Sequence, residues 1–408
     1  IFKSFKLLEK KKIIKIPANI KNFGVELPPK NQNADISCNA AMVLAKFNNT
    51  PPIKLAETLK KDLLLNFKEF KRIEIAGPGF LNIFFDIVFW KKNLEKIIKM
   101  DKKYGSNKIL GKKYNIEFVS ANPTGPLHVG HCRGAVLGDT LSNLLIFNGN
   151  KVTKEYYVND YGGQLKNFIS SVYFRILEIK DNKTFPYDKN LYPGDYIIDI
   201  AKKIIKENKI KSFVNLKKIY KKLTTESLKY SMEMIMDNLS LLGIKHNNFV
   251  YESSLINNNV VAKVVDKLKK KKYVYEGKLP APKGDEIKNW KIRKQLLFKS
   301  SMFGDDIDRA LQKEDGSWTY FAGDMGYHSH KISRKFDTLI NILGADHAGY
   351  IKRIESATKA ISDNKTNLIC KVSQLVKLFK NGNPYKMSKR KGDYITVDDL
   401  INEVGRDS

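Results

Sequence analysis

The four residues His-Val-Gly-His at 128–131 constrain the fold of this chain more than any other feature of its sequence. They follow a strand-like run at 114–119 and open a segment whose apolar residues recur at helical spacing until Asn148-Gly149. The N-terminus of a helix presents unpaired N–H groups and a partial positive charge, so it binds phosphate readily. Gly130 lets a nucleotide approach the backbone, and the two imidazoles can donate hydrogen bonds to phosphate oxygens. The pattern predicts an α/β domain that binds a nucleotide.

A second candidate phosphate-binding segment, Lys-Met-Ser-Lys-Arg at 386–390, lies near the other end of the chain. It carries two ammonium groups, those of Lys386 and Lys389, about one helical turn apart. Ammonium groups on a loop can close over the charge that develops at a pentacovalent phosphorus. Both segments therefore predict chemistry at the phosphates of ATP.

The chain is strongly basic, with a formal net charge of +30 over 408 residues. Such a balance favours a polyanionic partner, and nucleic acid is the obvious class. However, only nine of the 73 basic residues are arginine, and asparagine and isoleucine are also abundant. A biased genome composition would produce the same excess of lysine, so the sequence leaves both explanations open.

The three cysteines, at 38, 132 and 370, have no CxxC spacing and no nearby pair of histidines. This argues against a structural zinc site or a disulfide framework and fits a reducing cytoplasm. No segment approaches the roughly 18 uncharged apolar residues of a membrane span, and the first twenty residues lack a signal-peptide core. We therefore expect a soluble cytoplasmic protein without a metal site of its own.

Residues 1–100 are predicted to form a small α+β domain, with helices at 39–47 and 53–67 and strands at 72–76 and 80–85. The two strands meet at a Gly-Pro-Gly sequence, which is typical of a turn. Helices packed on one side of an antiparallel pair are a common arrangement for a module of this size.

A polar, Lys-rich segment at 101–113 is interpreted as a linker to a second domain, 114–408. The strand and helix around the His-Val-Gly-His turn, followed by a strand at 151–159, predict a βαβ unit. The fold class we expect is therefore α/β, a Rossmann-type parallel sheet with its ligands at the carboxyl ends of the strands.

A segment of about 163–275 is mostly helical by its periodicity and rich in lysine, and we predict that it is a helical insertion that interrupts the sheet. Sheet-like runs return at 318–321 and 338–343, each leading into a helix. The sheet is expected to resume there.

Four segments resemble arginyl-tRNA synthetases, which are class I enzymes. Residues 121–131 resemble the extended HIGH motif, and 156–164 are similar to the segment that follows it in bacterial members. Residues 76–82 resemble the end of the N-terminal additional domain, and 387–390 resemble the KMSKS loop. A lone H-x-G-H would be weak, because adenylyltransferases share it, but the four segments in this order are highly specific.

The resemblance has two departures. Arg390 stands where many class I enzymes carry serine, although both lysines are present. The family also continues into a helical anticodon-binding domain, whereas this chain begins at Ile1 without methionine and ends soon after an amphipathic run. We interpret the chain as a fragment that carries the tRNA-contacting N-terminal domain and the catalytic domain and lacks the anticodon-binding domain.

The resemblance implies an arginine–tRNA ligase. Such an enzyme uses ATP and Mg²⁺ to activate L-arginine to arginyl-adenylate and then transfers it to the 3′-terminal ribose of tRNA(Arg), releasing AMP and diphosphate. The first step needs alignment and charge stabilisation more than a base, because the nucleophile is already an anion. The implied catalytic residues are His128, His131, Lys386 and Lys389, and the implied state is a monomer.

A guanidinium group is planar and always charged, so its pocket needs carboxylates in a fixed arrangement. Asp324 lies four positions after Tyr320, so a helix would place phenol and carboxylate on one face. Asp324 could equally be a helix cap or a surface charge. The resemblance implies that the arginine-binding residues are Glu117, Asn122, His128, Tyr320 and Asp324.

For ATP, the acidic residue Asp346 follows a predicted strand and could hold a ribose hydroxyl, or it could be a helix N-cap. Met387 could contact adenine, or it could anchor its loop. The ATP-binding set that we predict is His128, Gly130, His131, Gly344, Asp346, His347, Met387 and Lys389.

Other functions remain open at this point. A small-molecule adenylyltransferase would lack an amino-acid pocket and tRNA-facing modules, and a non-catalytic RNA-binding protein would have lost the histidines or lysines of the two motifs. A cysteine-specific class I enzyme would require zinc ligands. The basic run Lys269–Lys272 could contact the acceptor arm of tRNA or be a solvated helix face.

Overall fold

The structure is a computed structural model, and it describes residues 1–17, 23–107, 111–186, 188–279, 293–376, 378–380, 383–385 and 395–405. Contacts between Cα atoms divide it into two compact units, Ile1–Ser106 and Asn107–Ser408. Among the described residues, no helix is both long and apolar enough to cross a membrane.

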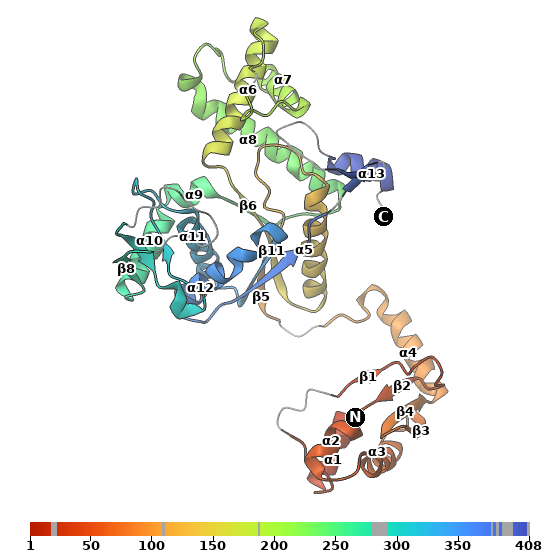
Figure 1. The fold of residues 1–408 in the computed structure, drawn as a ribbon. Coiled ribbons are helices and arrows are strands. Elements are labelled where there is room, and N and C mark those ends of the chain that lie inside the picture. Colours follow the sequence, from red (N-terminus) through yellow and green to blue (C-terminus); the bar gives the residue numbers. More distant parts are fainter. Residues whose placement is uncertain are drawn as a thin grey trace. The chain divides into compact units, whose positions relative to one another are not determined.

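The first unit is an antiparallel sheet with the strand order β1-β2-β4-β3 and helices packed against it (Figure 1). Its strands are β1 (Val25–Glu26), β2 (Ile36–Cys38), β3 (Phe70–Ala76) and β4 (Phe80–Phe85). Its helices are α1 (Phe2–Lys10), α2 (Ala40–Asn48), α3 (Pro52–Asn66), α4 (Ile87–Met100) and the 3₁₀ turn η1 (Asp101–Lys103). The two helices and two strands predicted here are confirmed.

The spacing of apolar residues along the chain explains why these helices and strands form. Leu44, Leu59 and Leu63 on α2 and α3 share one core with Leu81 and Ile83 on β4, and all five are fully buried. The turn between β3 and β4 needs glycine, because Gly77 and Gly79 have φ angles of +52° and +130°, which residues with a side chain rarely adopt.

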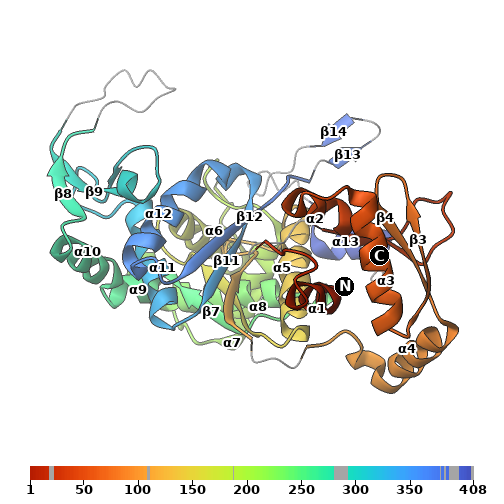
Figure 2. The same cartoon turned by 90° about the horizontal axis from the view of Figure 1, so that it is seen from below.

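The second unit is built on a five-stranded parallel sheet with the order β12-β11-β5-β6-β7 (Figures 1 and 2). Its strands are β5 (Lys113–Glu117), β6 (Lys151–Val158), β7 (Asn248–Tyr251), β11 (Thr338–Gly344) and β12 (Asn367–Ser373). The predicted α/β class and its first βαβ unit are confirmed, with α5 (Val129–Phe147) joining β5 to β6. The strand order reverses between β5 and β11, and such a switch point opens a crevice at the carboxyl ends of the strands.

Helices cover both faces of this sheet. In Figures 1 and 2, α5 lies on one side, and α11 (Tyr320–Ser333) and α12 (Ile351–Ser362) lie on the other. The smaller elements of the unit are α9 (Glu252–Asn257), α10 (Val260–Lys270), β8 (Val274–Gly277), β9 (Gln295–Phe298), η2 (Ser300–Phe303), β10 (Arg309–Ala310), η3 (Ala345–Tyr350), β13 (Leu378–Lys380), β14 (Asn383–Tyr385) and α13 (Val397–Val404).

The predicted helical insertion at 163–275 is too long. Three helices, α6 (Gly163–Asp181), α7 (Asp195–Glu207) and α8 (Leu216–Leu241), form a lobe with its own core (Figure 1). After this lobe, β7 returns to the sheet and pairs in parallel with β6. The sequence of β7, Asn-Phe-Val-Tyr, is too short to show a periodicity of its own.

The predicted strand at 318–321 is wrong. Thr319 is the N-cap of α11, and its hydroxyl accepts a hydrogen bond from the backbone N–H of Ala322 at 3.2 Å. The run Trp-Thr-Tyr-Phe has the composition of a strand, but the capping threonine starts a helix instead. The predicted strand at 338–343 is confirmed as β11.

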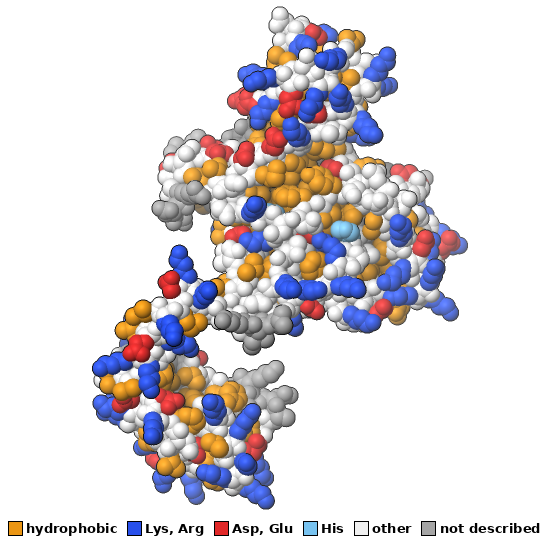
Figure 3. Space-filling view, turned by 180° about the vertical axis from the view of Figure 1, so that it is seen from behind, with side chains coloured by type: hydrophobic (Ala, Val, Ile, Leu, Met, Phe, Trp, Pro, Cys, Tyr) orange, Lys and Arg blue, Asp and Glu red, His pale blue; other side chains and the backbone are white. Residues whose placement is uncertain are grey.

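Basic side chains are spread over both units on the face shown in Figure 3, and no single basic face stands out there.

Candidate active site

A cavity of about 670 Å³ lies at the switch point of the parallel sheet. Loops after β5 and β11, the first turn of α5 and the inner face of α11 supply its walls. A smaller cavity of about 310 Å³ adjoins it and shares Tyr157, Asn159, Asp324, His347 and Tyr350 with it. The predicted residues that line the larger cavity are Glu117, Asn122, His128, Gly130, His131, Asp324, Gly344, Asp346 and His347.

The two histidines of the first motif stand at the start of α5. His128 is the N-cap, and its Nδ1 accepts a hydrogen bond from the N–H of Gly130 at 3.2 Å. The Nδ1 of His131 accepts from the N–H of His128 at 3.1 Å, and the two ring centroids are 3.9 Å apart. Because each Nδ1 is an acceptor, the neutral rings carry their protons on Nε2. These N–H groups can therefore donate to an anion at the helix N-terminus.

The loop before α5 is held by the helical lobe. The hydroxyl of Tyr196 on α7 donates to the carbonyl of Thr124 at 2.8 Å, and Ser231 on α8 donates to the carbonyl of Pro123 at 2.9 Å. Asn238, also on α8, accepts from the N–H of Leu127 at 3.0 Å. Three side chains from the lobe therefore fix the backbone that leads into the nucleotide-binding turn.

The second motif, with Lys386, Met387, Lys389 and Arg390, lies outside the described residues. Ile395, the first described residue after it, accepts a hydrogen bond from the N–H of Val129 at 3.0 Å. The chain that follows the motif is thus attached to the first turn of α5.

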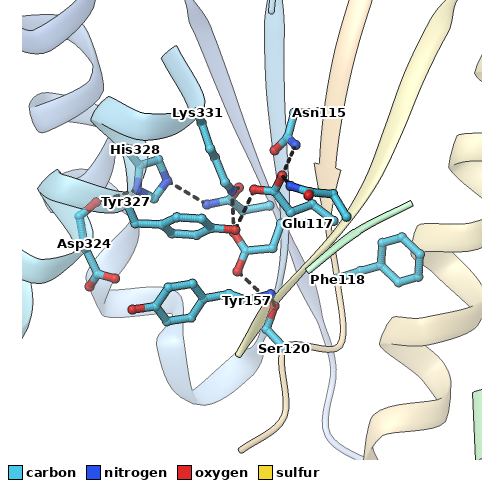
Figure 4. A network of polar contacts seen from close by, with 12 residues as sticks. Asn115, Glu117, Phe118, Ser120, Tyr157, Asp324, Tyr327, His328 and Lys331 are labelled. Atoms are coloured by element: carbon cyan, nitrogen blue, oxygen red, sulfur yellow. Dashed lines mark hydrogen bonds and ion pairs between the residues drawn. The ribbon is translucent and has the colours of Figure 1, made fainter. Parts of the chain in front are cut away.

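Glu117, predicted to bind arginine, is already ion-paired inside the protein (Figure 4). Its carboxylate accepts from the ammonium group of Lys331, whose side chain is 0% exposed, and from the hydroxyl of Ser120 at 3.0 Å. Glu117 keeps 12% of its side chain exposed and lines the larger cavity. A cationic group of the substrate that reaches Glu117 would therefore be its second cation, beside Lys331.

Asp324 faces the cavity from within α11, so it is neither a helix cap nor an isolated surface charge. The hydroxyl of Tyr350 donates to its Oδ2 at 2.7 Å. Burial raises the pKa of Asp324 to about 6, against the lowering effect of the Tyr350 hydrogen bond, and the charge of Glu117 adds to the rise. Among the residues that the structure describes, no cation forms an ion pair with this carboxylate.

Tyr320 and Asn122 occupy different positions around the cavities. Tyr320 is 83% exposed and lines the smaller cavity one helical turn from Asp324, at the start of α11. Asn122 lines the larger cavity, and its amide donates to Gln164 at 2.7 Å. The predicted pairing of phenol and carboxylate on one helical face is thus present, at the edge of the site.

Glu252 lines the smaller cavity and was missed by the sequence analysis. Burial raises its pKa to about 7, and the nearby charges of Asp324 and Asp160 add to the rise. It is the first residue of α9, directly after β7. A carboxylate at the carboxyl end of a parallel strand often indicates a ligand site. The sequence does not reveal Glu252 in this way, because β7 is too short to be predicted.

A second buried network holds α11 against the sheet. Glu155 on β6 is fully buried and pairs with both terminal nitrogens of the Arg334 guanidinium, at 2.5 and 2.8 Å. The hydroxyl of Tyr327 on α11 also donates to Glu155, at 2.9 Å. Burial alone would raise the pKa of Glu155, but the Arg334 hydrogen bonds and the Lys331 charge lower it to about 2.

The residues predicted for the ribose end of ATP lie after β11. Asp346 and His347 are in the first turn of η3, whose N-cap is Gly344, so Asp346 is not the N-cap residue. The His347 Nε2 is 3.5 Å from the Asp346 carboxylate, and both side chains are exposed. Among the described residues, no group of three or more His, Cys, Asp or Glu side chains could hold a metal ion.

Two family models match the chain in order. The N-terminal domain of arginyl tRNA synthetase matches residues 6–85, and the catalytic domain of the class I (R) tRNA synthetases matches residues 93–408. Among solved structures, the putative arginyl-tRNA synthetase of Campylobacter jejuni is 33% identical, with a TM-score of 0.66 over 78% of this chain and 66% of that one. The arginyl-tRNA synthetase of Thermus thermophilus, at 16% identity, shares the fold, with a TM-score of 0.66.

Relatives of known sequence match almost the whole chain. The arginine–tRNA ligase of Pelagibacter ubique is 56% identical over 405 residues, which is 99% of this chain and 70% of the relative. That of Wolbachia from Brugia malayi is 45% identical over 412 residues, 100% of this chain and 72% of the relative. Matches to both family models in the expected order, together with this identity over nearly every residue, show that the chain belongs to the arginyl-tRNA synthetase family.

Proposed function

We propose that this chain activates L-arginine with ATP and transfers the arginyl group to the 3′-terminal ribose of tRNA(Arg), releasing AMP and diphosphate. The observation that carries the substrate assignment is the acidic end of the site. Asp324 and Glu252 both line the smaller cavity. Burial raises the pKa of Asp324 to about 6, with a contribution from the charge of Glu117, and it raises the pKa of Glu252 to about 7, with contributions from Asp324 and Asp160. A guanidinium group stays charged at every relevant pH, so binding it would favour the ionised form of both carboxylates.

The direction in which arginine lies follows from the two cavities. Its carboxylate must reach the phosphates at the N-terminus of α5, which borders only the larger cavity. The guanidinium then extends into the smaller cavity towards Asp324, Glu252 and Tyr320. The α-ammonium group lies in the larger cavity, where Glu117 and Asn122 can accept its hydrogen bonds.

In the first step, an oxygen of the arginine carboxylate forms a bond to the α-phosphorus of ATP, and the bond to the β-phosphate oxygen breaks to release diphosphate. The positive end of the α5 helix dipole and the Nε2–H groups of His128 and His131 stabilise the charge on the phosphate oxygens. We propose the same role for Lys386 and Lys389. Gly130 allows the close approach, Gly344, Asp346 and His347 hold the ribose end, and Met387 contacts adenine.

In the second step, the terminal ribose hydroxyl of tRNA attacks the arginyl carbonyl carbon, and AMP leaves. Mg²⁺ would neutralise the negative charge of the phosphates when bound. Since the described residues form no metal-ligand group, we expect this ion to be carried mainly by the phosphate oxygens themselves. The first unit is proposed to contact tRNA, and the enzyme is proposed to act as a monomer in the cytoplasm.

The test is ATP–pyrophosphate exchange with arginine, measured with and without tRNA, and with lysine as the control amino acid. A protein extended to the full length of the relatives, of which this chain spans about 70%, is the second control. Exchange that is specific for arginine supports the proposal. Exchange only in the extended protein would mean that the site needs the additional segment. If neither protein shows arginine-dependent exchange, the synthetase function is wrong.

A further inference from the structure

A buried lysine lies directly behind the proposed arginine site. The side chain of Lys331, on α11, is fully buried, and its ammonium group lies 4.4 Å from the ring centroid of Tyr327. Lysine is almost never fully buried unless it is paired, because desolvating its charge is costly. Its partners are Glu117 and the side-chain oxygen of Asn341, the latter at 3.0 Å.

We propose that Lys331 is a positioning residue that holds the two arginine-binding carboxylates, Glu117 and Asp324, in place without touching the substrate. This inference rests on the proposed function. Lys331 does not line either cavity, whereas Glu117, Asn341 and Asp324 line the larger one. It therefore acts through its neighbours, along two branches.

The first branch fixes Glu117 (Figure 4). Lys331 donates to one carboxylate oxygen of Glu117, and the Ser120 hydroxyl donates to the other. The Ser120 hydroxyl also accepts a hydrogen bond from the N–H of Tyr157 at 3.1 Å. With both oxygens held, the carboxylate has one orientation, and its remaining lone pairs are available to an ammonium group in the cavity.

The second branch reaches Asp324. Because the Asn341 oxygen accepts from Lys331, its amide nitrogen points to His328 Nε2, at 3.0 Å. His328 then carries its proton on Nδ1 and donates it to the backbone carbonyl of Asp324 at 2.9 Å. Burial, together with the charge of Lys331, lowers the pKa of His328 to about 3, so this ring stays neutral in the cell.

Lys331 also reduces the repulsion inside the site. The charge of Glu117 raises the pKa of Asp324, which burial has already raised, and the charge of Lys331 lowers it. Removing Lys331 would therefore leave Glu117 without its cation and make Asp324 harder to ionise. Both changes would weaken the binding of arginine, because arginine brings two cationic groups, its guanidinium and its α-ammonium group, into the site.

The experiment compares Lys331→Met, Glu117→Gln and the double variant by calorimetric titration of the full chain with arginine and, separately, with ATP. We expect Lys331→Met to weaken arginine binding by about tenfold or more and to leave ATP affinity within about twofold. The double variant should lose less affinity for arginine than the sum of the two single losses, because Lys331 acts partly through Glu117 and partly through Asp324. Lys335→Met, the same change at an exposed lysine just beyond α11, is the matched control and should match the wild type.

The outcomes separate this inference from the proposed function. If neither the wild-type chain nor the protein extended to the length of the relatives binds arginine, both are wrong. If the wild type binds arginine and Lys331→Met binds it equally well, or loses ATP affinity to the same extent, only the role of Lys331 is wrong. The double variant has no unpaired buried charge and should fold even if Lys331→Met does not, and additive losses in it would also contradict the inference.

Discussion

The two ends of the site are built differently. The nucleotide end is local in sequence, because His128, Gly130 and His131 share one helix turn and hydrogen-bond to each other's backbone. The amino-acid end is assembled from Glu117, Glu252 and Asp324, which come from three elements, and Glu117 is held by a buried ion pair with Lys331. A phosphate site can thus be made from the dipole and the side chains of one helix turn, whereas a guanidinium site needs carboxylates brought together by the fold.

The strongest test of this contrast is to remove the cation that holds α11, a wall of the amino-acid end, against the sheet. Arg334→Met leaves Glu155 buried and unpaired, which typically costs about 3–5 kcal/mol of folding stability. We expect a large decrease in the urea midpoint of unfolding. His131→Ala, at the nucleotide end, removes the acceptor of the hydrogen bond from the His128 N–H and should cost far less, so equal losses would contradict the contrast.

Asp324→Asn should mainly affect arginine. Loss of a charge-assisted hydrogen bond in a buried site costs about 2–4 kcal/mol, so kcat/KM for arginine should fall by roughly 30- to 1000-fold. The KM for ATP should change little, because Asp324 points to the opposite end of the site. Tyr350→Phe, which removes only the hydroxyl that donates to Asp324, is the control and should have a smaller effect of the same kind.

His128→Ala should affect the chemical step instead. Removing one donor to a developing oxyanion costs about 100-fold in kcat, and the KM for arginine should stay near its wild-type value. His128→Asn separates this role from helix capping, since asparagine is a good N-cap. If the asparagine variant recovers full activity, capping rather than phosphate stabilisation explains the loss.

The pH dependence should also distinguish the two ends. Glu252 and Asp324, with pKa values of about 7 and about 6, are ionised above these values and neutral below them. Since arginine binds the ionised forms of both, its KM should rise by about 100-fold as pH falls from 7.5 to 5.5. Glu252→Gln should shift this rise to lower pH. A profile that is identical in the variant would exclude Glu252 from the site.

The smallest predicted effect tests whether the nucleotide end keeps its geometry without support from the helical lobe. Tyr196→Phe removes the hydrogen bond from the helical lobe to Thr124, worth about 0.5–1.5 kcal/mol. We expect kcat to fall a few-fold, with the KM for arginine unchanged and the urea midpoint only slightly lower. An unchanged kcat would show that the turn before α5 keeps its geometry without the lobe.

Much of the fold was predictable because its signals are local. The βαβ unit from β5 to β6 follows from apolar runs and one capping histidine, and the helices of the first unit follow from helical spacing. The errors at β7 and at 318–321 have the same physical origin. A four-residue strand has no periodicity to detect, and an aromatic run takes the structure that its neighbours and caps select.

Sequence by itself determined the family, the α/β class and the nucleotide-binding turn, because each depends on residues that are neighbours in the chain. Only the tertiary structure decided that Glu117 is paired with Lys331, that Glu252 joins the acidic cavity and that the lobe holds the loop before α5. These relations join residues up to 214 positions apart. The pKa values and orientations of such groups depend on burial and on neighbouring charges, which exist only once the sheet and its helices have packed.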